Sequence, residues 1–229
     1  MLSEIIEIIK KSIVYIKQGE STGTGFIISQ EGNLVTCNHV VAGGAAAKVY
    51  LTDRELQLDA EVLRRLPERD IAILKIEAPD LIPLVLGQCE DVAEGDEVMF
   101  CGFPFAIKTL TTHKGIISAK FTAGQQADSF PTLHPSTNVL QLDATVNMGN
   151  SGGPLLKLEN QRVVGLVNAR FGRIPDEWIQ KVGAAKGLIA GVRGGIRVDP
   201  FEELQNILVT MNKTMQLGIG YAVSTEYIT

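Results

Sequence analysis

The strongest constraint on the fold is a series of short, β-branched runs, separated by glycines, that fills most of the chain between residues 12 and 167. These runs are IVYIK, TGFIIS, NLVTC, AKVYL, LDAEVLRR, DIAILKI, EVMFCGF, GIISAKF, NVLQLDA, PLLKL and RVVGLVNA. Short strands at this spacing predict antiparallel sandwiches or barrels and argue against alternating β-α units. At 229 residues and 45% hydrophobic content, the chain can bury a core as one larger domain or as two β units sharing an interface. We therefore expect an all-β fold.

Two segments carry a helical pattern instead. Isoleucines at helical spacing predict a short amphipathic helix over residues 2–11 that lays one face on the body of the protein. In DPFEELQNILVTM, Asp199 is placed to act as N-cap and Pro200 takes the first helical position, which predicts a second helix. We interpret residues 170–198 as a long loop with one or two helical turns, and the late GIGYAVS as a further strand.

The charge of the chain argues against two classes of partner. The net charge is −5, and the carboxylates that cause it are scattered, with no cluster of lysine or arginine. Nucleic acids and anionic membranes attract basic patches. We therefore expect neither nucleic acid nor membrane as a partner.

The N-terminus and the cysteines indicate the compartment. MLSEIIEIIKKSIVYIK interrupts its isoleucines with charged side chains and contains no continuous apolar region or cleavage site of the secretory type. Cys37, Cys89 and Cys101 are odd in number and lack the C-x-x-C spacing of a metal site. We therefore expect buried free thiols in a cytoplasmic protein, with no metal and no cofactor.

The stretch NMGNSGGPLL contains Ser151 between glycines, which raises the question whether this serine is a nucleophile. A serine hydroxyl needs a base within hydrogen-bond reach, and a third group that orients the base. The candidate bases are His39, His113 and His134, all of which precede the serine. His113 and His134 are interpreted as surface loop residues, because no cluster of metal-ligand spacing surrounds them.

The order of these residues along the chain separates the known arrangements. GNSGG also fits the nucleophile elbow of α/β-hydrolases, but that fold places its histidine after the serine, and no histidine follows Ser151. An acid, histidine, serine order using His113 would need a parallel α/β sheet, which the strand pattern does not support. The remaining order is histidine, acid, serine, with His39 at the end of LVTCNHVVA and Asp70 at the start of DIAILKI. Asp143 is a competing acid and is interpreted as structural.

Three motifs in this order resemble a known family. TCNHVV, RDIAILKI and GNSGGPLL, with STGTGFIIS ahead of them, are similar to the protease domain of the Deg/HtrA serine proteases, within the trypsin-like superfamily. The resemblance covers most of residues 12–169 and resumes at about 218; we expect no PDZ domain. It implies a chymotrypsin-like fold of two six-stranded antiparallel β-barrels within a single peptidase domain over 1–229. The barrels would span about 12–85 and about 95–229, with a loop and helix region inserted at about 170–217.

The resemblance also implies roles for single residues. His39 would be the general base and then the general acid, Asp70 would orient its imidazole, and Ser151 would attack the scissile carbonyl. The backbone N–H groups of Gly149 and Ser151 would form the oxyanion hole, with Asn150 shaping the turn.

Two positions depart from trypsin-like enzymes that are activated by cleavage. Those enzymes carry an aspartate at the position of Asn150, which captures a newly made N-terminal amine, so we expect no zymogen cleavage near SIVYI. Thr145, six residues before the serine, would floor the primary specificity pocket, with Asn168, Ala169 and Arg170 beside it. Because an uncharged floor cannot pair with Lys or Arg, we expect a preference for small or medium apolar side chains.

The sequence thus predicts a serine endopeptidase that hydrolyses protein or peptide substrates through an acyl-enzyme. It leaves open whether the peptidase is latent until a protein partner or substrate orders the oxyanion loop. The oligomeric state is open as well, although relatives often form trimers. The alternative is a catalytically silent, protease-like scaffold protein whose cleft only holds a peptide or a partner chain.

Overall fold

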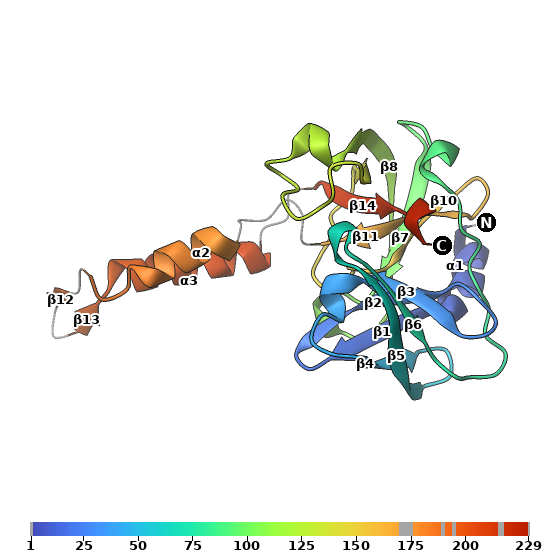
Figure 1. Cartoon of the computed structure of the whole chain (residues 1–229), viewed down its shortest axis with the longest axis horizontal. Coiled ribbons are helices and arrows are strands. Elements are labelled where there is room, and N and C mark those ends of the chain that lie inside the picture. Colours follow the sequence, from blue (N-terminus) through green and yellow to red (C-terminus); the bar gives the residue numbers. More distant parts are fainter. Residues whose placement is uncertain (1, 170–175, 189–190, 194–195, 215–217, 229) are drawn as a thin grey trace. The chain divides into compact units, whose positions relative to one another are not determined.

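Strands β1 to β6 close the first of two antiparallel barrels in the computed structural model, which describes residues 2–169, 176–188, 191–193, 196–214 and 218–228 (Figure 1). The strands follow one another around the barrel in the order β1-β2-β3-β6-β5-β4. Their bounds are β1 Ile13–Gln18, β2 Ser21–Ile27, β3 Asn33–Cys37, β4 Ala46–Leu51, β5 Leu56–Leu66 and β6 Ile71–Lys75.

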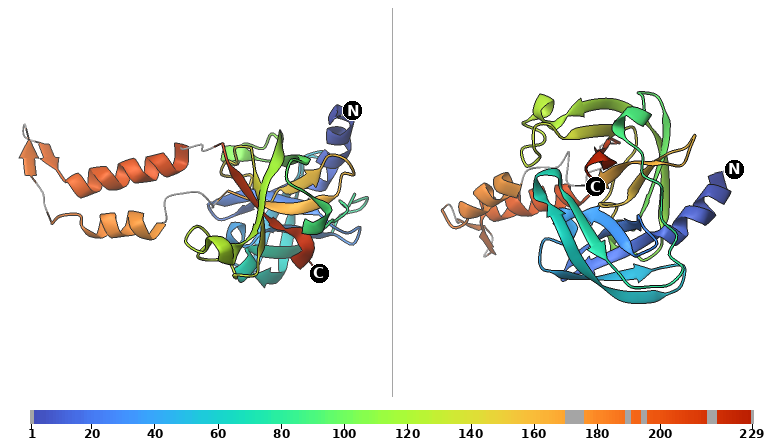
Figure 2. Two further views of the ribbon diagram at one scale, coloured as in Figure 1. Left: turned by 90° about the horizontal axis from the view of Figure 1, so that it is seen from above. Right: turned by 45° about the vertical axis from the view of Figure 1, so that its right-hand side comes forward.

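The second barrel is also closed and antiparallel, in the order β10-β11-β14-β9-β8-β7, and it lies beside the first (Figure 2). Its bounds are β7 Glu97–Gly102, β8 Thr111–Thr122, β9 Asn138–Leu142, β10 Pro154–Lys157, β11 Val163–Asn168 and β14 Gly220–Ser224. The predicted all-β, chymotrypsin-like fold of two six-stranded barrels is confirmed.

Apolar side chains from both barrels pack into one continuous cluster. Val14, Ile16 and Phe26 of the first barrel belong to it, together with Met99 and Phe103 of the second, and all five are fully buried. Each buried side chain of this size contributes roughly 1.5–3 kcal/mol to folding. The shared core holds the barrels together, so that residues from both can meet in one site.

An N-terminal helix and short 3-10 turns accompany the strands of the two barrels. The predicted N-terminal helix runs over Leu2–Ile9 as α1 and continues as a 3-10 turn, and its Ile5, Ile6 and Ile9 side chains pack on the core. The 3-10 turns are η1 Lys10–Ser12, η2 Asn38–Val40, η3 Pro67–Arg69, η4 Cys89–Asp91, η5 Pro104–Ala106, η6 Ala123–Gln126 and η7 Thr225–Tyr227.

Residues 172–217 form a compact unit of their own. It contains α2 Asp176–Ala184, β12 Gly191–Arg193, β13 Ile196–Val198 and α3 Pro200–Thr214, with β12 and β13 paired as a two-stranded sheet. Asp199 Oδ1 accepts the N–H groups of Phe201 at 3.0 Å and Glu202 at 3.3 Å, so the predicted N-cap is confirmed. The prediction for 170–198 missed the two strands, because three residues are too short to display alternation.

All three cysteines are free and buried, as the sequence predicts. Burial raises the pKa of the Cys101 thiol to about 11 and also raises the pKa of Cys89. No helix in the described part of the chain is long and apolar enough to cross a membrane.

Candidate active site

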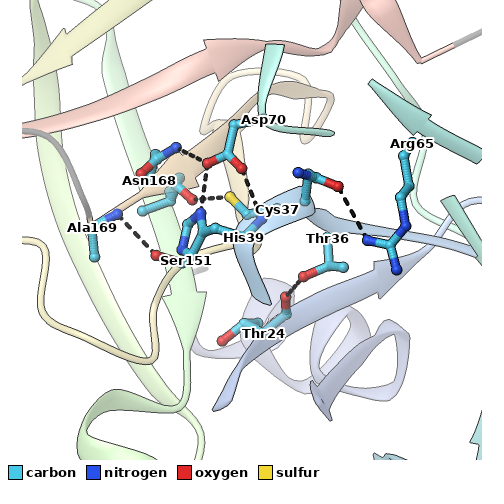
Figure 3. Close-up of polar contacts among 11 residues, drawn as sticks. Thr24, Thr36, Cys37, His39, Arg65, Asp70, Ser151, Asn168 and Ala169 are labelled. Atoms are coloured by element: carbon cyan, nitrogen blue, oxygen red, sulfur yellow. Dashed lines mark hydrogen bonds and ion pairs between the residues drawn. The ribbon is translucent and has the colours of Figure 1, made fainter. Parts of the chain in front are cut away.

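His39 and Asp70 form a doubly hydrogen-bonded pair in the first barrel (Figure 3). His39 lies in η2, directly after β3, and Asp70 directly precedes β6, which pairs with β3. One carboxylate oxygen of Asp70, Oδ2, lies 2.6 Å from His39 Nδ1, and the other, Oδ1, accepts the His39 backbone N–H at 2.9 Å. A carboxylate can only accept a hydrogen bond, so Nδ1 of the imidazole must carry the proton and donate it. Asp70 therefore holds the imidazole as the tautomer whose Nε2 is free to take a proton.

The backbone around this pair is fixed on both sides. Asp70 adopts a left-handed conformation with φ +54°, which aspartate tolerates better than most residues, and its carbonyl accepts the Asn38 N–H at 2.9 Å. Arg65 on β5 donates to the Asn38 side chain and to the carbonyls of Val41 and Gly44. The loop that carries His39 is therefore clamped by the neighbouring strand.

Asn168, at the end of β11 in the second barrel, also contacts Asp70. Its side-chain N–H donates to Asp70 Oδ2 at 2.6 Å, and both residues are buried (Figure 3). The sequence placed Asn168 only in the specificity pocket. A polar amide at the end of the fully buried VVGLVN strand was the available signal, but its partner lies in the other barrel.

Ser151 lies in the loop before β10 and is 3% exposed. Its hydroxyl oxygen accepts the backbone N–H of Ala169 at 3.0 Å (Figure 3). This contact uses a lone pair and leaves the hydroxyl proton uncommitted. Among the described residues, no hydrogen bond joins the hydroxyl to His39; without substrate, such bonds are often long and tighten when substrate binds.

The backbone before Ser151 leaves two donors without acceptors in the described part of the chain: the N–H groups of Gly149 and Ser151. The intervening N–H of Asn150 donates to Asn147 O at 3.1 Å. Gly149 is buried with φ +94°, and a Cβ there would lie 2.2 Å from Phe103 O, so only glycine fits. Two free donors, one on each side of Asn150 along the chain, can stabilise an oxyanion next to the serine hydroxyl.

A model of the trypsin-like peptidase domain matches residues 23–166, which contain His39, Asp70 and Ser151. The chain belongs to the trypsin-like peptidase family. The matched segment begins within β2 and ends within β11, so it spans strands of both barrels.

Relatives of this chain carry DegP-like and HtrA-type names, which confirms the Deg/HtrA resemblance. The probable periplasmic serine endoprotease DegP-like of Hahella chejuensis is 39% identical over 150 residues, or 66% of this chain and 30% of that protein. Protease Do-like 1, chloroplastic, of Arabidopsis thaliana is 33% identical over 215 residues, or 92% and 44%. The HtrA-type protease AlgW, solved with a tripeptide, matches 98% of this chain and 60% of that chain with TM-score 0.68 and 26% identity.

The chain therefore spans less than half the length of these two curated relatives. Their names place those proteins in the periplasm or the chloroplast. The comparisons thus give no support to the cytoplasmic location predicted from the sequence.

Three of the four predicted pocket residues lie in the described part of the chain. Thr145 is half-buried in the loop between β9 and β10, and Asn168 and Ala169 are buried at the end of β11. Arg170 lies outside the described residues. Asn168 and Ala169 contact Asp70 and Ser151 respectively, so they support the candidate catalytic groups directly.

The other titratable candidates lie apart from this arrangement. His113 is not a loop residue as predicted: it lies in β8, and its ring stacks on Phe100 with centroids 4.7 Å apart. Burial lowers the pKa of His113, which favours its neutral form. His134 is in a loop and contacts Ser136, and Asp143 is exposed.

Cys37 brings a third metal-ligating atom to the His39 and Asp70 pair. Its Sγ and one ligand atom of each partner all lie within 4.8 Å of one another. The imidazole and the carboxylate already bond each other at 2.6 Å, and the thiol lies 3.4 Å from Val167 O. A cation would have to displace the bond that holds the imidazole. The sequence inference about metal sites missed this group, because it rested on the spacing between cysteines alone.

The side chain of Asn150 is completely buried, and within the described residues neither its amide oxygen nor its amide nitrogen has a hydrogen-bond partner. The equivalent aspartate of cleavage-activated relatives needs a cationic partner at this point. Ile13, the residue that such a cleavage would expose, is buried within β1 and pairs with Phe26 of β2. The pocket around Asn150 is therefore suited to a neutral side chain.

Replacing Asn150 by aspartate is expected to lower the free energy of unfolding by about 4 kcal/mol at neutral pH, because burial raises the pKa of the new carboxyl. The unfolded chain keeps an ordinary carboxyl pKa of about 4. The loss is therefore absent below about pH 4 and grows as the pH rises toward the folded-state value. Urea unfolding of both proteins at acidic and neutral pH measures this, and an equal loss at both would contradict it.

Proposed function

We propose that this chain is a serine endopeptidase whose catalytic residues are His39, Asp70 and Ser151. The observation that carries the proposal is the contact between Asp70 Oδ2 and His39 Nδ1 at 2.6 Å, which leaves Nε2 as a base. Ser151, with its uncommitted hydroxyl proton, and the two free N–H groups beside it support the same assignment.

The first half of the reaction forms an acyl-enzyme. The Ser151 hydroxyl proton moves to His39 Nε2 as Oγ bonds the scissile carbonyl carbon. The carbonyl oxygen becomes an oxyanion and accepts from the N–H groups of Gly149 and Ser151, each worth about 3 kcal/mol of transition-state stabilisation. His39 then returns its proton to the leaving amine as the C–N bond breaks.

The second half releases the acyl group. A water molecule replaces the amine, His39 takes one of its protons, and the new hydroxyl bonds the acyl carbon. Collapse of this second tetrahedral intermediate breaks the Oγ bond, and the proton returns to Ser151. Asp70 stays ionised throughout and stabilises the imidazolium. The steps require neither a metal nor a cofactor.

The substrates we propose are proteins or peptides, in keeping with the peptide in the AlgW structure. Purified chain should generate new N-termini in an unfolded protein substrate, detected by mass spectrometry, and Ser151→Ala should not. Ser118→Ala, an exposed serine on β8, is the matched control and should cleave as the native protein does. Cleavage that persists in Ser151→Ala would contradict the proposal.

Thr145 as the floor of the primary pocket predicts cleavage after small or medium apolar residues. A neutral hydroxyl offers no charge to offset the desolvation of a buried lysine or arginine. A library of peptides randomised on the amino side of the cleaved bond measures this preference. A profile dominated by Lys or Arg would contradict it.

The Ser151 hydroxyl contacts Ala169 and not His39. This contact is consistent with a resting state that completes its catalytic contacts only when substrate or an activating protein partner binds.

We propose one peptidase domain with the 170–217 segment as an insert, and a homo-oligomer is part of the proposal by analogy with relatives. The free buried thiols are compatible with a cytoplasmic location. A silent scaffold protein is the alternative, and the two free oxyanion donors argue against it.

A further inference from the structure

Thr24 on β2 of the first barrel makes two hydrogen bonds to the loop that carries Ser151, one from its hydroxyl and one from its backbone N–H. Its hydroxyl donates to Gly149 O at 2.7 Å and accepts the Phe103 N–H at 3.1 Å. Its backbone N–H donates to Ser151 O at 2.8 Å, and its carbonyl accepts the Thr36 hydroxyl at 2.6 Å. The side chain is fully buried, so water does not compete for these contacts.

The end of β7 and the loop that carries Ser151 both pack closely around Thr24. A Cβ on Gly102 would lie 2.9 Å from the Thr24 hydroxyl oxygen, and a Cβ on Gly152 would lie 2.1 Å from the Thr24 carbonyl oxygen. Glycine at both positions allows the backbone of the second barrel to approach Thr24 directly. Thr24 therefore occupies a space bounded by the end of β7 and by the loop that carries Ser151.

The direction of each candidate oxyanion donor depends on the carbonyl of the preceding residue, because a trans peptide places its N–H opposite its C=O. The Met148 carbonyl accepts from Phe105 N–H at 2.8 Å, so the Gly149 N–H of the same peptide points away from Phe105. The Asn150 carbonyl accepts from Gly153 N–H at 3.0 Å, so the Ser151 N–H of that peptide points away from Gly153. Both donors are therefore aimed by bonds on the far side of their peptides.

The peptide between Gly149 and Asn150 links the two peptides that carry the candidate oxyanion donors. Glycine at φ +94° rotates more easily than any other residue, so this peptide is the place where the loop could turn and misdirect a donor. Its carbonyl is held by the Thr24 hydroxyl, and its N–H donates to Asn147 O. Removing the hydroxyl would leave the buried Gly149 carbonyl and Phe103 N–H unpaired, which favours rearrangement of the loop.

We propose that Thr24 is a positioning residue, whose hydroxyl holds the Gly149 carbonyl and so keeps the Gly149 and Ser151 N–H groups aimed at the substrate oxyanion. It touches no reacting atom. The proposal rests on the proposed peptidase function and adds a residue from the opposite barrel to the catalytic apparatus.

Thr24→Val keeps the shape of the side chain and removes only the hydroxyl, whereas Thr24→Ser keeps the hydroxyl. Thr36→Val makes the same change one strand away, at a hydroxyl that bonds Thr24 O and not the loop. The full chain with each substitution is reacted with a fluorophosphonate probe, and kcat and KM are measured on a cleaved peptide. Thermal unfolding of each variant sets a temperature at which all are folded.

We expect Thr24→Val to slow labelling and lower kcat at least about tenfold, with KM nearly unchanged, because only the transition state uses the aimed donors. Thr24→Ser and Thr36→Val should stay within about threefold of the native protein. Native rates in Thr24→Val, or equal losses in Thr24→Val and Thr24→Ser, would overturn the proposal. If Thr24→Val does not fold, Thr24→Ala takes its place with the same two outcomes.

The native protein and Ser151→Ala separate this inference from the function on which it rests. A native chain that the probe does not label at Ser151 removes the proposed peptidase and the role of Thr24 with it. A native chain that is labelled, beside a Thr24→Val variant labelled at the same rate, overturns only the role of Thr24.

Discussion

Alanine in place of either Ser151 or His39 is expected to lower kcat for peptide hydrolysis by about 10⁶-fold, and the double variant should lose no more than either single one. The two groups act as a unit: Oγ without a base is a weak nucleophile, and the base without Oγ has no proton to take. Steady-state kinetics on one peptide substrate measures all three variants. KM should change little, since neither side chain contributes much to holding the ground state.

His134→Ala is the matched control for the histidine. His134 lies in a loop and contacts only its neighbour Ser136 through its ring among the described residues, so its loss should leave kcat unchanged. Losses that add up in the double variant, giving far less activity than either single change, would contradict a shared step. Activity of His39→Ala near the native value would assign the base to another residue.

Replacing Asp70 by asparagine is expected to lower kcat by about 10⁴-fold while the fold persists. The carboxylate accepts from three donors: the His39 backbone N–H, the His39 ring and the Asn168 amide. An asparagine amide must turn its NH₂ toward one side or the other. Toward the ring, it forces the imidazole into the tautomer with the proton on Nε2, which cannot act as a base.

Toward the backbone, the same NH₂ faces the His39 N–H, donor against donor, and the loop that carries His39 is pushed away. Either orientation therefore removes the general base. Asp59→Asn is the control, because Asp59 is an exposed acid on β5 that pairs with Lys48, and the change should leave kcat unaltered. An Asp70→Asn variant that retains more than about a tenth of native kcat would contradict the assigned role.

The sequence was sufficient for the parts of the protein that follow from local pattern and chain order. Short apolar runs predicted the strands, and the placement of His39 and Asp70 at strand ends follows from where LVTC stops and IAILK starts. The absence of any histidine after Ser151 excluded the hydrolase fold. These inferences need only one segment at a time, or the order of several.

Contacts between the barrels could not be predicted in this way. Asn168 reaches Asp70 across 98 residues of sequence, and Thr24 reaches Gly149 across 125, so neither partner is visible in the local string. His113 was misassigned to a loop because β8 begins before the apolar run GIISAKF. The strand already includes the polar residues that precede this run. Packing on Phe100, and not polarity, decided its place.

The measurement that tests the central claim most directly is covalent labelling of the full chain with a fluorophosphonate probe, followed by mass spectrometry of the modified peptide. Ordinary serine hydroxyls do not react with this probe, so the site of the adduct reports an activated nucleophile. We predict one adduct, on Ser151 within NMGNSGGPLL, that is lost in His39→Ala although the serine is still present. An adduct on another residue, or labelling of Ser151 that survives the loss of His39, would contradict the proposed catalytic site.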